Sequence, residues 1–199
     1  METSKQKTLA IFDFDGTLTT RDTFIDLIIF SKGIFSLLAG ILINFRILLL
    51  YLLGMTSGDN AKEQLFAFFF KNLKSDQFLN ICQKYAQNRI PKILNQRVLN
   101  KFFWHKARGD ITVIVTASIK QWVEPLAFEL GFKRVIATEI EILNQKLTGK
   151  FSTPNCNGPE KVKRFVYSFP NHPTYLLYVY GNLKGDKELM QLAGHSEII

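Results

Sequence analysis

The sequence is poor in cysteine, and it contains no internal repeat and no low-complexity linker. Its 199 residues include two cysteines, Cys82 and Cys156, which lie far apart and form no CxxC pair. This spacing excludes a disulfide framework and gives no sign of a zinc site. We expect two free, buried thiols in a cytoplasmic protein.

Long apolar runs are also missing. A membrane-spanning helix needs about 18 consecutive apolar residues with few charges, whereas the longest uncharged stretch in residues 24–54 runs only from residue 33 to residue 45. We interpret this segment as a buried pair of helices, and peripheral attachment to a membrane remains the alternative. Residues 1–7 are polar, so we expect no signal peptide before the first apolar run.

Acidic residues are scarce in one part of the chain. The net charge is +8, and no acid occurs between Asp76 and Asp110, a stretch rich in lysine and arginine. Such a stretch forms a solvated helical face or attracts an anionic ligand or surface. The basic positions spread around the helix rather than along one stripe, and Pro91 interrupts it. We therefore expect no nucleic-acid partner.

The hydrophobic fraction of 47% supports a real core. Apolar, β-branched segments predict parallel strands at residues 9–14, 111–116, 134–138 and 175–180, with a closing edge strand at 196–199. Helices are predicted at residues 119–130, 158–169 and 187–192, and a hairpin at 139–151. Strands that alternate with helices indicate an α/β fold, a Rossmann-like doubly wound and mostly parallel sheet.

About a hundred residues separate the first two strands, which is far more than a crossover needs. The intervening segment has helix-period apolar residues and turn signals at Gly54 and Gly58. We predict an inserted helical cap at residues 19–106, and an α/β catalytic core made of residues 1–18 and 107–199. The cap would cover whatever lies at the end of the first strand.

Two carboxylates, Asp13 and Asp15, follow the first apolar strand. Like charges repel and burial penalises both, so a cation or a chemical task is expected there. In a doubly wound sheet, ligands sit at the carboxyl ends of the strands. Asp15, Thr116 and Asn182 all fall at such ends, and this edge of the sheet is the candidate site.

Several motifs occur in the order and setting of the haloacid dehalogenase superfamily. They are Asp13-Phe14-Asp15-Gly16-Thr17, Thr116-Ala117-Ser118 with Trp122, Gly158-Pro159-Glu160-Lys161, and Gly181-Asn182-x-x-Gly185-Asp186. The chain resembles more narrowly the phosphoserine-phosphatase-like branch (subfamily IB), which carries a helical cap between the first two motifs. The resemblance covers essentially the whole chain.

The resemblance implies a phosphatase that works through an aspartyl-phosphate. Asp13 would attack phosphorus. Asp15 would protonate the leaving oxygen and then deprotonate the attacking water. Gly16 would allow the sharp turn beneath the phosphate. Thr116 and the Ala117 N–H, at a helix start, would hold phosphate oxygens.

Two further features complete what the resemblance implies. Lys161 would supply a positive charge against the nucleophile and the phosphoryl group. Mg²⁺ would bind the Asp13 side chain, the Asp15 carbonyl and the Asn182 side chain, with Asp186 ordering a metal water. Family members usually have a carboxylate where this chain has Asn182. The lost charge, with Lys184 nearby, predicts weaker metal binding.

The substrate is less defined. Asp22 either caps a helix or holds a substrate amine, as in phosphoserine phosphatases. Thr116-Ala117-Ser118 differs from the serine-glycine-glycine run of those specialists, so we expect a small phosphorylated metabolite. The alternatives are a membrane-surface lipid-phosphate phosphatase, similar to phosphatidylglycerophosphate phosphatases, and a metal-weak non-catalytic relative. The oligomeric state is open. We assign Trp122 and Phe68-Phe69-Phe70 to the core and no catalytic role to the histidines.

Overall fold

The computed structural model describes residues 6–199, without the side chains of Leu183 and Lys184. Residues 1–5, which belong to the polar segment where no signal peptide was expected, lie outside the described residues. The Lys184 side chain, expected near Asn182, also lies outside them.

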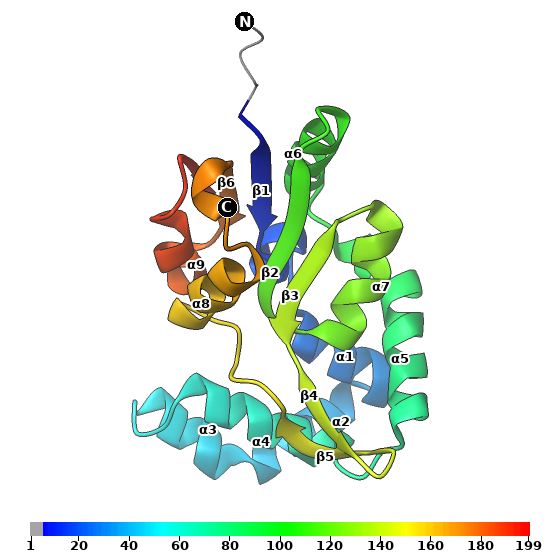
Figure 1. The fold of residues 1–199 in the computed structure, drawn as a ribbon. Helices are drawn as coiled ribbons and strands as arrows, with labels where there is room; N and C mark the ends of the chain where they lie inside the picture. Colours follow the sequence, from blue (N-terminus) through cyan, green and yellow to red (C-terminus); the bar gives the residue numbers. More distant parts are fainter. Residues whose placement is uncertain (1–5) are drawn as a thin grey trace, which may run out of the picture.

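A five-stranded parallel sheet forms the centre of the molecule (Figure 1). Its order is β3-β2-β1-β6-β7, and each neighbouring pair is parallel. The strands are β1 (Thr8–Phe12), β2 (Ile111–Ile119), β3 (Arg134–Thr138), β6 (Leu176–Gly181) and β7 (His195–Ile198). The predicted α/β, Rossmann-like doubly wound sheet is confirmed. The strand order reverses between β1 and β6, which is where such sheets bind ligands.

Helices cover both faces of the sheet because the strands are apolar on both sides. In β1, Leu9 and Ile11 pack with Phe165 and Leu189, whereas Phe12 packs on the opposite face with Trp122 among others. One layer is α8 (Pro159–Ser168) with α9 (Leu183–Met190). The other is α1 (Thr23–Lys32), α6 (Gln96–Ala107) and α7 (Lys120–Leu130), and short turns lie at Ile90–Ile93 and His172–Thr174.

Most of the remaining elements form a layer at the carboxyl end of the sheet, whereas α5 (Ser75–Asn88) runs alongside α7 (Figure 1). The layer consists of α2 (Ile34–Ile43), α3 (Phe45–Leu52), α4 (Gly58–Phe70) and the antiparallel hairpin of β4 (Ile140–Leu143) with β5 (Lys146–Phe151). The hairpin joins the cap helices, since Asn72 N–H donates to the Leu147 carbonyl over 2.8 Å. At the other end of the predicted cap, α6 packs on the sheet through Phe102. The domain boundaries at 19 and 106 stay a prediction.

The predicted hairpin at residues 139–151 is confirmed as β4 and β5, and the chain reverses at its two central residues. Asn144 and Gln145 have φ angles of 49° and 60°, the left-handed conformations that a two-residue hairpin turn demands. Two other elements differ from prediction. β2 continues to Ile119, so Thr116 and Ala117 lie in an irregular strand end and not at a helix start. α9 begins at Leu183, earlier than the predicted residue 187, and includes Gly185 and Asp186 of the last motif.

The prediction that residues 24–54 form a buried pair of helices is wrong for α2 and α3. In α3 no residue is buried, and in α2 only Leu37 and Gly40 are. The first helix of the segment, α1, does bury one side, through Phe24, Leu27 and Ile28. Within the phenylalanine run, Phe70 is buried as expected but Phe68 is exposed. Trp122 and both free cysteines are buried, as predicted. An apolar composition therefore does not tell which helices pack in the core and which remain exposed.

None of the helices in residues 6–199 is by itself long and apolar enough to cross a membrane. Only α1 and α2 taken together pass by length and composition, and their axes are bent by 116°.

Candidate active site

The first aspartate lies at the end of β1, in a tight turn. Asp13 N–H donates to the Tyr180 carbonyl over 2.9 Å, which ties the aspartate to the neighbouring strand. The turn (Phe14–Leu18) closes with a hydrogen bond from Thr19 N–H to the Phe14 carbonyl. Gly16 has a φ of 73°, a left-handed conformation that disfavours other residues. The Asp13 carboxylate is buried, and it would be unstable there without a partner.

Lys161 is that partner. Pro159 is the first residue of α8, and Lys161 in the first turn is buried, with its Nζ 2.7 Å from Asp13 Oδ1 and 2.5 Å from Asp186 Oδ1. Burial opposes the charged ammonium, but the two carboxylates outweigh burial and raise the pKa of Lys161. Burial, together with the negative charge of Asp13, raises the pKa of Asp186. The three groups form one buried charge network.

Asp15 lies in a different electrostatic environment. Its Oδ1 accepts hydrogen bonds from Thr23 N–H over 3.0 Å and from Thr23 Oγ1 over 2.6 Å, and its Oδ2 accepts from Ser118 Oγ. Burial, and then the charge of Asp22, raise the pKa of Asp15 to about 6, although these hydrogen bonds oppose the shift. Asp15 can therefore hold or release a proton near neutral pH.

A cation from the cap also reaches the site. Lys62 on α4 donates from Nζ to the Ala117 carbonyl over 2.7 Å. Burial lowers the pKa of Lys62, while Asp15 and Asp22 are the foremost of the groups that counteract the shift. Asp22 accepts from Ile25 N–H over 3.0 Å, so it caps α1 as one of the two sequence interpretations predicted. Thr116 Oγ1 accepts from Ser118 N–H, which shapes the end of β2.

The last motif follows β6. Asn182 N–H donates to Asp186 Oδ2 over 2.9 Å, and Asn182 Oδ1 accepts from Gly185 N–H over 3.1 Å. The amide nitrogen of Asn182 faces Asp13 Oδ2 at 3.4 Å. A Cβ at Gly181 would collide with the Asp186 carboxylate, so glycine is required for this close approach.

These residues surround a cavity of about 210 Å³. Most of the predicted site residues line it, together with three residues to which the sequence analysis gave no chemical role. Two predicted residues do not line it: Gly16 is exposed in the turn, and Asp186 lies behind Lys161. The predicted residues that line the cavity are Asp13, Asp15, Asp22, Thr116, Ala117, Lys161 and Asn182; the additional ones are Lys62, Asn157 and Gly185.

Sequence reasoning missed some of these residues for understandable reasons. Ser118 and Thr23, which hold Asp15, have no charge and no spacing that indicates a partner. Lys62 is one of many lysines in a helical segment, and its helix periodicity does not reveal which face meets the core. The available signal for Ser118 is its place in the Thr116-Ala117-Ser118 motif.

The oxygen donors fit a hard divalent cation, although weakly. Asp13 and Asp186 offer carboxylates, and the Asp15 carbonyl and Asn182 offer neutral oxygens. Among the described residues, no group of three or more His, Cys, Asp and Glu side chains could hold a metal. For Asn182 to offer Oδ1 toward Asp13, its amide must rotate and give up the bond from Gly185 N–H, which costs about 1 kcal/mol.

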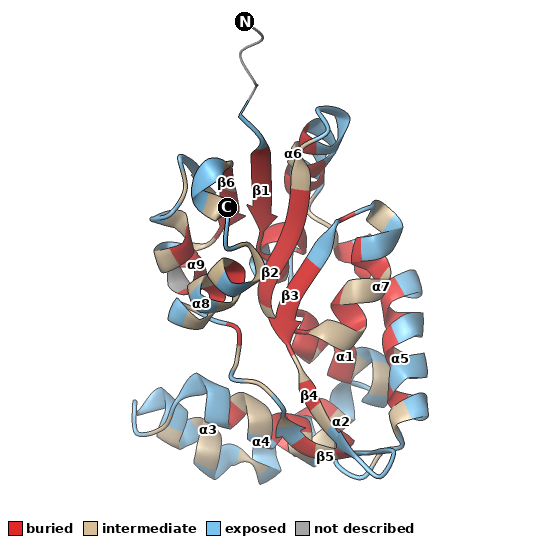
Figure 2. Cartoon of the chain, in the orientation of Figure 1, coloured by how far each residue is buried: buried red, intermediate tan, exposed pale blue. Residues whose placement is uncertain are grey.

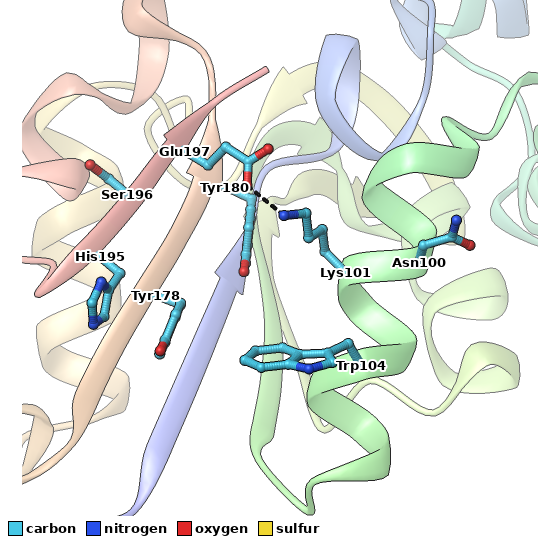
Figure 3. Close-up of a pocket in the computed structure, with 8 residues that line it drawn as sticks. All are labelled: Asn100, Lys101, Trp104, Tyr178, Tyr180, His195, Ser196 and Glu197. Carbon is cyan, nitrogen blue, oxygen red and sulfur yellow. Dashed lines mark ion pairs between the residues drawn. The ribbon is translucent and has the colours of Figure 1, made fainter.

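A larger cavity, of about 420 Å³, lies elsewhere in the fold, between α6 and strands β6 and β7 (Figure 3). Trp104, Tyr178 and His195 give it aromatic walls. Its lysine is already paired, because Lys101 Nζ lies 3.0 Å from Glu197 Oε2. Its single acidic residue, Glu197, is the one paired with Lys101, whereas the smaller cavity brings several aspartates together, so the smaller cavity is the better candidate for chemistry.

Comparisons with known proteins agree with this geometry. Protein CicA of Caulobacter vibrioides is 29% identical over 193 residues, which cover 96% of this chain and 86% of that protein. A Bordetella pertussis Tohama I protein of unknown function has the same fold, with a TM-score of 0.81, 20% identity and coverage of 96% and 89%. A substrate-bound phosphoserine phosphatase gives a TM-score of 0.69 at 17% identity, with coverage of 97% and 86%.

At such identities, the solved structures establish the fold alone. The family profile of haloacid dehalogenase-like hydrolases, in contrast, matches residues 10–191, which include each motif from Asp13 to Asp186. The chain is therefore a member of the haloacid dehalogenase-like hydrolase family of enzymes.

Proposed function

We propose that the protein is a Mg²⁺-dependent phosphomonoester hydrolase that acts on a small phosphorylated metabolite through an aspartyl-phosphate. The observation that carries the proposal is the pairing of opposite roles in one cavity. Asp13 is buried against Lys161, while Asp15 has a pKa of about 6. A nucleophile and a proton donor need such different environments. The phosphoserine phosphatase fold and the hydrolase family also support it.

The proposed reaction has two steps. An Asp13 oxygen attacks phosphorus and the ester P–O bond breaks, while Asp15 gives its proton to the leaving oxygen. Asp15, now ionised, takes a proton from a water molecule whose oxygen attacks phosphorus. The acyl-phosphate bond breaks, inorganic phosphate leaves and Asp13 is restored. Thr116, the Ala117 N–H and Lys161 hold the phosphoryl oxygens.

Charge balance supports a metal cofactor. The described groups that line or back the cavity include four aspartates (13, 15, 22 and 186) and two lysines (62 and 161), an excess of acids that repels a phosphate ester. Asp13, the Asp15 carbonyl, Asn182 and Asp186 would hold Mg²⁺, which neutralises phosphoryl charge when bound. Two free, buried thiols fit an enzyme of the reducing cytoplasm.

Asn182 sets the metal requirement. We expect Asn182→Asp to lower the Mg²⁺ concentration for half-maximal turnover by roughly tenfold, because it adds a negative oxygen ligand and needs no amide rotation. A Mg²⁺ titration of phosphatase rate in both proteins measures this. An unchanged midpoint would rule out a metal-contacting role for position 182.

Asp22 tunes the proton donor. Since Asp15 must be protonated to donate, kcat/KM for an alkyl phosphate should fall as pH rises above about 6. The negative charge of Asp22 raises the pKa of Asp15; Asp22→Asn removes it, and the descending limb should move to lower pH. At about pH 7, activity should drop roughly twofold to threefold.

Asparagine is also a good N-cap, so the same variant should keep the stability of α1. An aryl phosphate, whose leaving group needs no proton, serves as the control and should show little change. A limb that stays in place with the alkyl phosphate would contradict this role of Asp22.

A phosphatase screen with Mg²⁺ tests the proposed function directly. It should include phosphoserine, sugar phosphates, nucleotides and lysophospholipid phosphates, with Asp13→Asn as the negative control. Hydrolysis of at least one substrate that depends on Asp13 supports the proposal. No hydrolysis of any substrate would favour the non-catalytic alternative.

A second candidate is a lipid-phosphate phosphatase. The exposed apolar side chains of α2 and α3 favour it, because a membrane-bound substrate requires a surface that meets the membrane. Faster hydrolysis of lysophospholipid phosphates than of soluble metabolites in the screen would identify this candidate.

A further inference from the structure

The helices α2 and α3 expose an unusually apolar surface. Of the side chains in residues 34–55, Phe35 is 84% exposed, Leu42 76% and Leu52 78%. Figure 2 shows α3 mostly in the colours of exposed and intermediate residues. We call this surface the apolar helix pair; its exposed members are Ile34, Phe35, Leu38, Ile41, Leu42, Ile43, Phe45, Leu49, Tyr51, Leu52, Leu53 and Met55. Monomeric soluble proteins rarely expose a contiguous apolar patch of this kind without an interaction partner.

Local geometry directs this segment away from the core. Gly33, at a φ of 84°, separates α1 from α2, and the two axes differ by 116°. α2 then touches α4 along one narrow stripe, since a Cβ on Gly40 would collide with the Phe69 ring. The rest of its surface faces outward. The exposure is therefore built into the backbone and is not a consequence of a missing core.

Charge distinguishes between a lipid and a protein partner. No acidic residue occurs between Asp26 and Asp59, and the charged residues in that interval are Lys32 and Arg46, both exposed. A protein interface normally has a polar rim around its apolar centre. A segment that combines apolar side chains with cations alone matches the acyl region and anionic headgroups of a membrane.

A groove on the same surface also combines apolar side chains with a cation. Its volume is about 330 Å³, and it lies where α2, α3 and α4 meet. Arg46, Asn44 and Gln64 supply polar groups, whereas Ile43, Ile47 and Leu50 supply apolar walls. Such a groove fits an amphiphile with an anionic headgroup better than a soluble ion.

From these observations we propose that the apolar helix pair docks the protein on an anionic lipid bilayer, with α2 and α3 lying in the interface and Arg46 at the headgroups. Docking does not depend on the proposed phosphatase activity. It would orient the active site, because α3 packs against the start of α4 through Tyr51 and Gly58, and α4 carries Lys62 into the cavity.

The test is flotation of the full-length protein, without substrate, with phosphatidylcholine vesicles that do or do not contain phosphatidylglycerol. We expect flotation with the anionic vesicles. A Phe35→Ser, Leu42→Ser, Leu52→Ser variant should bind at least about tenfold more weakly. The matched control is Phe128→Ser, Tyr167→Ser, Ile198→Ser, which removes exposed apolar side chains elsewhere and should float as the unmodified protein does. Arg46→Gln should weaken binding to anionic vesicles selectively.

Two results would overturn the proposal. One is protein that stays at the bottom of the gradient with anionic vesicles. The other is equal flotation of the helix-pair variant and the control variant. Sedimentation equilibrium of both variants identifies self-association as the competing use of the surface: a dimer that dissociates only in the helix-pair variant, with no vesicle binding, would contradict lipid docking. Because no substrate is present, failure here leaves the proposed function to its own screen.

Discussion

Replacing Asp13 with asparagine is expected to lower phosphatase turnover by about three orders of magnitude or more. An amide is a poor nucleophile and forms no acyl-phosphate. The fold should survive, because Lys161 keeps its contact of 2.5 Å with Asp186. The charge of Asp13 also raises the pKa of Asp186, so removal of that charge relieves repulsion in the network. Steady-state kinetics and thermal unfolding of the same preparation measure both effects.

The matched control is Asp76→Asn, an exposed aspartate in the first turn of α5. It should leave turnover unchanged. The mass of the Asp13→Asn protein must first exclude reversion to aspartate. Turnover by that protein near the rate of the unmodified enzyme would then contradict the assignment of Asp13 as the nucleophile.

The second large effect concerns Lys161. Replacing it with methionine leaves Asp13 and Asp186 buried without their cation, and should cost about 3–5 kcal/mol of unfolding free energy. Phosphatase activity should fall together with stability, because the same ammonium faces the phosphoryl group. Urea denaturation of both proteins measures the loss.

The pH dependence of that loss has a definite sign. The folded-state pKa of Lys161 is raised, so its stabilising contribution is present below the unfolded pKa and is lost only at strongly alkaline pH. In the variant, Asp186 loses the cation that opposes the upward shift of its pKa by burial and by Asp13, so it retains its proton in the folded state and its ionisation destabilises the fold as pH rises. The stability difference should therefore be smaller at about pH 5 than at about pH 8.

Lys163→Met provides the control, since Lys163 lies on the same helix but its side chain is 77% exposed. Its unfolding free energy should change by less than about 0.5 kcal/mol at both pH values. A Lys161→Met variant as stable as this control would show that the buried network does not hold the site together.

The sheet was predictable because its strands are continuous, apolar and separated by clear turn signals. β3 has the predicted bounds, and the hairpin followed from the alternation of apolar and polar residues in 139–151. The ends of elements were less predictable. α9 begins directly after Asn182 because the Asp186 carboxylate accepts from the Asn182 N–H, a contact that propensity alone does not contain.

The site was predictable where residues lie at the carboxyl ends of strands in one parallel sheet, as Asp13, Thr116 and Asn182 do. The orientation of the cap helices was not predictable, because a helix in a long insertion can turn any of its faces toward the active site. Lys62 therefore went unrecognised, and so did the exposure of Phe35 and its neighbours. An apolar helix has the same composition whether a protein core or a lipid surface covers it.

The most direct test of the account is to trap the aspartyl-phosphate. Asp15→Asn enzyme is mixed with an aryl phosphate and Mg²⁺, quenched in acid, digested and mapped by mass spectrometry. The aryl leaving group needs no proton, while hydrolysis of the intermediate lacks its base, so the phosphoenzyme should accumulate. We predict one phosphoryl group on the peptide that contains Asp13. The mechanism would be contradicted if the unmodified enzyme releases phosphate but neither protein carries a phosphoryl group on Asp13. A phosphoryl group on another residue, or on no residue, would be such a result.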